Sequence, residues 1–297
     1  MFVDIVMPIA LLAATLTSLF LNQKTEKRLK DTLQEREFRV KDTAALLVTM
    51  AAMIALVVLI PSYALMILFL FSYSMLLFMF TYVFSNNRWY FAVIPPIIFI
   101  LLYVFLGTSL VFEPTFIWSI YLVNIYGLLF AVLITLYIGN LFTWKTTAIF
   151  AVALTGLDIV LVLITGTMVS AANKALSLNL PVLVTLPTFP PVFLNDYHIF
   201  MRLGLGDFFF TGLLALQTLK RYGRNLAIMA AVAMATSFFI WEAILLNYRI
   251  PAFPGTVMII IGWLPFIIYE SLKQMRVSQK GLPTSPAGEN IPKPDAP

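Results

Sequence analysis

Long runs of apolar residues recur along this chain and constrain its fold more than any other feature. Each run has about twenty residues, the length that a helix needs to cross ~30 Å of hydrocarbon at ~1.5 Å per residue. Hydrophobic residues make up 61% of the 297 residues and charged residues only 11%, which leaves too little polar surface for a soluble domain. The runs therefore predict an all-α, polytopic membrane protein embedded in the lipid bilayer.

The positions of these runs predict nine transmembrane helices. A polar segment of residues 22–42 follows the first run and suits a solvated or interfacial helix. The predicted spans are Val3–Leu21, Thr43–Ile60, Tyr63–Phe84, a fourth that starts near Tyr90, Pro114–Tyr137, Trp144–Thr167, His198–Leu219, Asn225–Leu246 and Pro254–Tyr269.

The spans divide the chain into four parts. Residues 1–168 hold the first six membrane helices, and residues 199–270 hold helices seven to nine. Between them, residues 169–198 form a Pro-rich connecting loop that is too long for a simple turn and alternates β-branched with apolar residues. We expect no regular helix in this loop, and connections of this length are either functional or mobile. The tail, residues 271–297, is rich in Pro, Ser, Gly and Lys and is expected to be disordered.

The distribution of Lys and Arg predicts the orientation in the membrane. With the N-terminus outside, sixteen of these residues fall on the cytoplasmic side and only Lys174, Arg202 and Arg249 fall outside. Cytoplasmic loops carry the excess of positive charge. The sequence therefore predicts an integral protein of the cell membrane with its N-terminus outside and its C-terminus in the cytoplasm.

Composition also excludes several kinds of chemistry. The chain has no cysteine and a single histidine, His198, so thiolate catalysis, a Ser–His triad and a His- or Cys-based metal cluster are poor interpretations. The net charge of +5 is small and resides in particular loops, which makes nucleic acid a poor partner. We expect no metal and no cofactor.

Two aspartates lie well inside predicted spans, where a charged side chain is costly and demands an explanation. Asp158 lies in span six and Asp207 in span seven, and both spans meet the outer end of the connecting loop. Asp158 is roughly ten residues from that end and Asp207 roughly eight, so at ~1.5 Å per residue both should lie ~12–15 Å below the outer boundary. Consecutive antiparallel helices can bring two carboxyls at matching depth face to face.

Such a pair of carboxyls has a chemical use. Two carboxyls that share a proton titrate as a coupled pair, one ionised and one neutral. The ionised carboxylate takes a proton from water as the water attacks a peptide carbonyl, and the neutral carboxyl donates to the oxyanion or to the leaving nitrogen. Either aspartate alone fits equally well as a residue satisfied by a neighbouring hydroxyl, or as a proton relay in a transporter.

Two further motifs flank these aspartates. Gly204 and Gly206 precede Asp207 in the sequence Gly204-Leu205-Gly206-Asp207, and small residues within a membrane helix allow another backbone to approach. The sequence Pro251-Ala252-Phe253-Pro254 begins span nine on the same outer face, and its prolines withhold amide donors and disfavour helix. An unwound strip there could bind an extended substrate as an added strand. Taken alone, it also fits a Pro-rich helix start.

Together these residues resemble the presenilin and signal peptide peptidase family of GxGD intramembrane aspartyl proteases. The motif Gly204–Asp207 matches completely, whereas Phe253 stands where the Pro-Ala-Leu motif has Leu, and Leu157 stands where Tyr precedes the aspartate of span six. The resemblance covers order, spacing and the nine-span plan over residues 1–270. It implies a presenilin-like bundle in a small prokaryotic, archaeal homologue.

The resemblance also implies function. Asp158 and Asp207 would be the catalytic residues, with residues 204–206 and 251–254 shaping the active site and binding the substrate. Substrates would be transmembrane peptides, and the predicted orientation is similar to that of signal peptide peptidase, which favours signal-peptide remnants or type II anchors. No obligatory partner subunit is implied, and a homo-oligomer stays open.

Two other classes use similar residues. A proton-coupled membrane transporter would also pair carboxylates in the membrane, but such transporters usually have similar halves, and we detect no internal repeat. A prepilin or preflagellin peptidase also carries GxGD, but those enzymes tend to have fewer spans and no strip like Pro251–Pro254.

Overall fold

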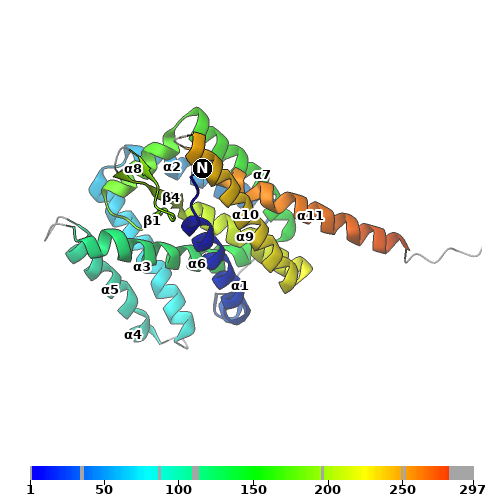
Figure 1. Cartoon of the computed structure of the whole chain (residues 1–297). Coiled ribbons are helices and arrows are strands. Elements are labelled where there is room, and N and C mark those ends of the chain that lie inside the picture. Colours follow the sequence, from blue (N-terminus) through cyan, green and yellow to red (C-terminus); the bar gives the residue numbers. More distant parts are fainter. Residues whose placement is uncertain are drawn as a thin grey trace, which may run out of the picture.

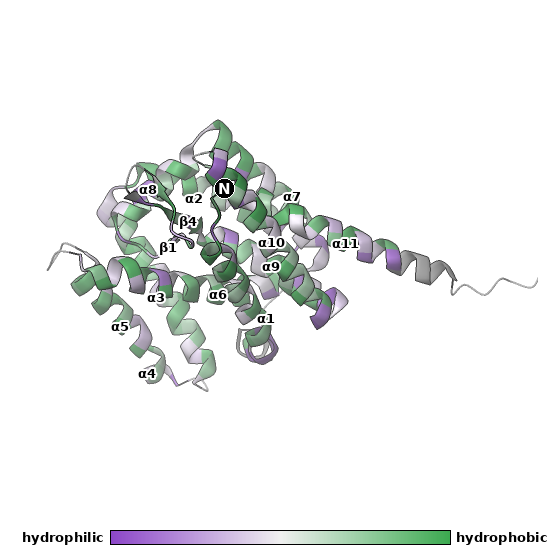
Figure 2. Ribbon diagram, in the orientation of Figure 1, coloured by the Kyte–Doolittle hydropathy of each residue, from purple (hydrophilic) through white to green (hydrophobic). Residues whose placement is uncertain are grey.

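The computed structural model describes residues 2–33, 37–85, 88–108, 114–194, 197–248, 250 and 252–280. Within these residues, eight helices are long and apolar enough to cross a membrane, which indicates an integral membrane protein and agrees with a predominantly helical, polytopic fold. Figure 2 shows that the helices are largely hydrophobic along their length and that hydrophilic residues gather near their ends.

The helices and strands follow one another along the chain as Figure 1 shows. The helices are α1 (Val6–Leu33), α2 (Val40–Leu59), α3 (Ser62–Phe84), α4 (Trp89–Ala92), α5 (Ile94–Leu102), α6 (Val123–Leu141), α7 (Trp144–Ile159), α8 (Thr167–Ser177), α9 (Leu205–Tyr222), α10 (Arg224–Tyr248) and α11 (Gly255–Lys280). Three π-helical segments are η1 (Tyr103–Gly107), η2 (Ile117–Leu122) and η3 (Val160–Ile164), and the strands are β1 (Leu183–Pro187), β2 (Phe193–Leu194), β3 (Tyr197–His198) and β4 (Phe200–Gly204).

Helix α9 lies at the centre of the bundle. It contacts α1, α6, α7, α10 and α11, and every residue from 208 to 218 is buried. A helix enclosed by protein on all sides can carry polar residues if other helices satisfy them. Gln217, for example, donates from Nε2 to the carbonyl oxygens of Gly139 (3.1 Å) and Phe142 (2.9 Å). The eight apolar spans do not include α9, whose 18 residues carry Asp207, Lys220 and Arg221.

An antiparallel hairpin joins α8 to α9. Strand β1 pairs with β4 in the register Leu183↔Gly204 to Pro187↔Phe200, and β2 pairs with β3 further out. The prediction that a helix begins at His198 is therefore wrong, because residues 198–204 are extended up to the start of α9. Each residue of β4 pairs with a residue that lies 13 to 21 positions earlier in the chain, and a local sequence pattern does not reveal such a pairing.

Three other boundaries differ from the sequence prediction. The segment from residue 22 continues α1 to Leu33, so the first span and the polar segment form one helix through that residue. The connection predicted as non-helical begins with helix α8, since all four of its prolines come later, at residue 181 and beyond. Helix α11 continues to Lys280, past the predicted end at residue 270, and residues 281–297 of the predicted tail lie outside the described residues.

The buried side chain of Asn124 fixes the hairpin to α6. Its Nδ2 donates to the carbonyl oxygen of Thr185 (2.7 Å), and its Oδ1 accepts the N–H of Thr185 (2.7 Å). The side-chain amide of Asn124 thus binds both the N–H and the C=O of Thr185, which point away from β4. We conclude that Asn124 takes the place of a neighbouring strand at the outer edge of β1.

Replacing Asn124 with Ala is expected to loosen the hairpin. The change leaves two buried backbone groups of Thr185 without partners, a loss of about 1–3 kcal/mol for each unsatisfied group. Hydrogen exchange should show faster exchange across residues 183–187 and 200–204 than in the wild type. The replacement Asn140→Ala removes a buried amide that binds Asn22 (2.7 Å) at the other end of α6 and should leave hairpin exchange unchanged.

Candidate active site

Asp158 comes from the last turn of α7. Its side chain is buried, with 8% of the residue exposed, and the chain changes from α- to π-helical geometry two residues later, at the start of η3. The sequence prediction of a carboxylate buried among membrane helices holds for Asp158.

Asp207 lies in the first turn of α9 and not, as predicted, eight residues into a longer helix. Gly204 ends β4 and precedes the helix, and Gly206 lies in the first turn. The N–H of Leu205 donates to the carbonyl oxygen of Val182 (3.1 Å), which continues the strand pairing up to the start of the helix. The first motif is therefore a strand-to-helix junction that presents a carboxylate at a helix N-terminus, where negative charge is favoured.

The start of α11 brings the two aspartates together. The hydroxyl of Thr256 donates to Oδ2 of Asp158 (2.6 Å), and the N–H of Thr256 donates to the same oxygen (3.4 Å). The preceding residue, Gly255, packs so closely on Asp207 that an added Cβ would lie 2.5 Å from Oδ1. Consecutive residues of α11 thus contact the carboxylates of α7 and α9.

Gly255 and Thr256 were not among the residues predicted for the site. Thr256 is 4% exposed and Gly255 is buried, so neither has a surface role. The only signal in the sequence was their position directly after Pro254, at the start of a span. A Thr in that position commonly serves a helix start, and its contact with Asp158, 98 residues away, arises only from packing.

The strip before α11 is non-helical over Ala252 to Pro254, as predicted from its prolines. The ring of Phe253 stacks on Trp241 of α10, with centroids 5.4 Å apart and an interplanar angle of 11°. This contact holds the strip against α10 beside Gly255. Pro251, which was predicted to belong to the same strip, lies outside the described residues.

The described residues contain no group of three or more His, Cys, Asp or Glu side chains that could hold a metal ion. The site instead presents two carboxylates and the hydroxyl of Thr256 in a largely apolar bundle. Asp207 is more exposed than Asp158, since the structure leaves it half-buried. Paired carboxyls of this kind suit proton transfer to and from a reacting group.

A comparison of the sequence with models of known protein families and with curated proteins found no match. The geometry of the two aspartates therefore carries the functional inference.

Proposed function

We propose that this protein is an intramembrane aspartyl endopeptidase of the presenilin and signal peptide peptidase type, with Asp158 and Asp207 as its catalytic pair. The observation that carries the proposal is the contact of both carboxylates with consecutive residues at the start of α11. In this proposal α9 also crosses the membrane, as the seventh of nine crossings in chain order. The N-terminus is outside and the C-terminus in the cytoplasm, so the enzyme would cut type II anchors or signal-peptide remnants.

The proposed reaction is hydrolysis of a peptide bond by water. One carboxylate accepts a proton from water as the water oxygen bonds to the carbonyl carbon of the peptide. The other carboxyl donates its proton to the developing oxyanion. The tetrahedral intermediate then breaks the C–N bond as the nitrogen receives a proton. The Thr256 hydroxyl fixes the orientation of Asp158, and Asp207, which Gly255 contacts, completes the pair.

The hairpin supports binding of an extended substrate. The bonds from Leu205 N–H to Val182 oxygen and from Thr188 N–H to Ile199 oxygen set the alternation of the ladder. By that alternation the N–H and C=O of Arg202 point away from β1, as those of Thr185 do on the opposite edge. The edge of β1 is bound by Asn124, whereas the edge of β4 leads directly into Asp207. A substrate unwound from its helix would add to β4 as a strand.

The test of this function is cleavage of a synthetic type II transmembrane substrate by the purified protein in liposomes. Mass spectrometry of the products should locate a cut within the apolar span of the substrate. Absence of cleavage by folded protein would contradict the proposal, and a proton-flux assay in the same liposomes would then test the transporter alternative.

Replacing Thr256 with Val is expected to lower kcat by about 10- to 100-fold, because loss of a hydrogen bond to a charged group is worth about 1.5–3 kcal/mol. Val keeps the shape of Thr but removes the donor to Asp158. The matched replacement Thr256→Ser keeps the hydroxyl and should retain most of the activity. Equal activity of the Val and Ser variants would show that the hydroxyl has no role in positioning Asp158.

A further inference from the structure

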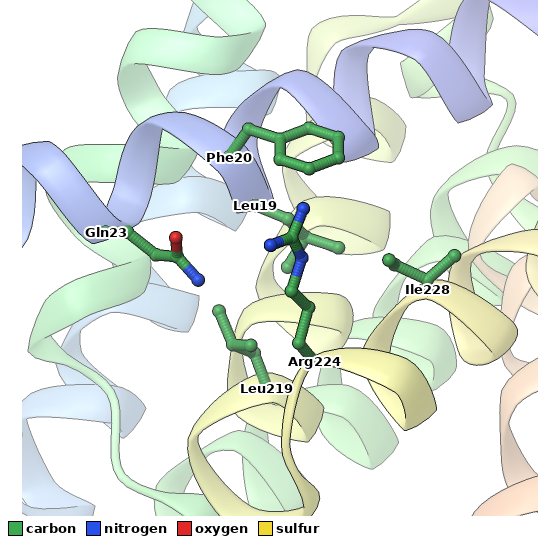
Figure 3. Close-up of a pocket in the computed structure, with 6 residues that line it drawn as sticks. All are labelled: Leu19, Phe20, Gln23, Leu219, Arg224 and Ile228. Carbon is green, nitrogen blue, oxygen red and sulfur yellow. The ribbon is translucent and has the colours of Figure 1, made fainter.

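A shallow groove lies at the opposite end of the bundle from the hairpin, between α1 and the turn that joins α9 to α10. Figure 3 shows its lining: the apolar side chains of Leu19, Phe20, Leu219 and Ile228 surround the polar heads of Gln23 and Arg224. The groove is remote from both aspartates, and the proposed reaction does not use it.

The Arg224 guanidinium is held in place without a carboxylate. It lies over the ring of Phe20 on α1, 4.8 Å from the ring centroid. Two described carboxylates at this end pair with lysines, Glu26 with Lys220 (3.8 Å) and Glu270 with Lys273 (3.9 Å). An arginine stacked on an aromatic ring is pre-oriented for hydrogen bonds to a phosphate or carboxylate. The guanidinium of Arg224 is therefore held in a fixed orientation, and no carboxylate among the described side chains is paired with it.

This end of the molecule carries most of the positive charge. Among the described side chains, only Lys174 and Arg202 lie at the hairpin end, and Lys174 donates to the carbonyl oxygens of Val58 and Ile60 at the end of α2. The cations at the groove end are Lys24, Lys27, Arg28, Arg39, Lys41, Arg88, Lys145, Lys220, Arg221, Arg224 and Lys273. Juxtamembrane cations attract anionic lipids.

The groove lies where the predicted first span, Val3–Leu21, ends. Leu19 is thirteen residues into α1, so it lies ~20 Å from the start of that helix, towards the end of the crossing. Arg224 is the first residue of α10, and Ile228 lies one turn deeper. The amide of Gln23 and the guanidinium of Arg224 thus lie near the ends of predicted spans, and apolar side chains such as Ile228 lie one turn further in.

We propose that this groove binds one anionic phospholipid. The lipid phosphate accepts hydrogen bonds from the Arg224 guanidinium and the Gln23 amide, and the first part of an acyl chain lies along Leu19, Phe20 and Ile228. The lipid would bridge α1 to α10, two helices that contact each other and the central helix α9. A lipid is favoured over a soluble anion because the walls below the cation are apolar and face the membrane.

The test is native mass spectrometry of the whole purified protein with added phosphatidylglycerol, phosphatidylcholine or glycerol phosphate. We expect one tightly bound phosphatidylglycerol, with phosphatidylcholine and glycerol phosphate binding at least about tenfold more weakly. Arg224→Gln should weaken phosphatidylglycerol binding by about tenfold or more, since it removes charge-assisted hydrogen bonds. Ile228→Trp, which fills the apolar wall, should also weaken binding.

Arg221→Gln is the matched control, because Arg221 lies at the same end but stacks on Trp144 (4.6 Å) outside the groove. Equal losses from Arg221→Gln and Arg224→Gln would mean general attraction to the basic end and would overturn the site. Equal binding of phosphatidylcholine or of glycerol phosphate would also overturn the site. So would a mass spectrum that shows dimers of the protein with no bound lipid. The measurement is of binding alone, so its outcome is independent of whether the protein cleaves peptides.

Discussion

Replacement of Asp158 or Asp207 with Asn is expected to reduce the rate of substrate cleavage at least ~1000-fold, because each carboxyl carries one half of the proton transfer and an amide cannot take its place. Cleavage of the type II substrate, followed by mass spectrometry, measures the effect. The double variant should be no slower than either single variant, since the two groups act as a unit and their effects are not additive.

The control for these variants is stability. Asn has the shape of Asp and still accepts the Thr256 hydrogen bond through Oδ1, so both variants should remain folded in detergent and melt close to the wild type. A folded Asp207→Asn variant that cleaves at the wild-type rate would exclude the two-aspartate mechanism. A variant that is inactive only because it unfolds would be recognised by its melting curve.

Gly255→Ala is expected to reduce cleavage by about 100-fold or more. The added methyl group would lie 2.5 Å from Oδ1 and 2.7 Å from Cγ of Asp207, so the carboxylate or the start of α11 must move. A displacement of ~1 Å in a catalytic group can cost about 100-fold in rate. The effect should appear in kcat, because the change alters the geometry of the reacting groups.

Gly204→Ala provides a matched control at the same carboxylate. A Cβ at Gly204 would lie 3.4 Å from Oδ2 of Asp207, and its φ of −71° and ψ of 148° suit any residue. This variant should keep cleavage within about tenfold of the wild type. If Gly204→Ala were as damaging as Gly255→Ala, the effect could not be attributed to the contact between α11 and Asp207.

Apolar runs along the chain were sufficient to predict a predominantly helical membrane protein, because a span must satisfy its backbone hydrogen bonds within itself. The eight apolar spans of the structure correspond to eight of the nine predicted. Helix α9 is the exception in both boundary and composition. It is enclosed by other helices, so its side chains need not be as hydrophobic as those of a helix that contacts lipid.

The aspartates were predictable as a pair because a carboxylate in a membrane span is rare enough to require a reason. The position of Asp207 within its helix was not predicted correctly, since Asp207 follows a strand and lies in the first turn of α9. The hairpin pairs residues 13 to 21 positions apart, and Asn124 of α6 binds the outer edge of β1. Such long-range pairings leave no local periodicity to read.

The sequence by itself determined the membrane environment, the number and order of most helices, and which carboxylates needed an explanation, because these follow from composition and from the local rules of helix formation. Only the tertiary structure decided that Gly255 and Thr256 hold the two aspartates together and that Arg224 shares a groove with α1. Those contacts depend on which helix faces which, and that arrangement is set by packing over the whole bundle rather than by any single segment.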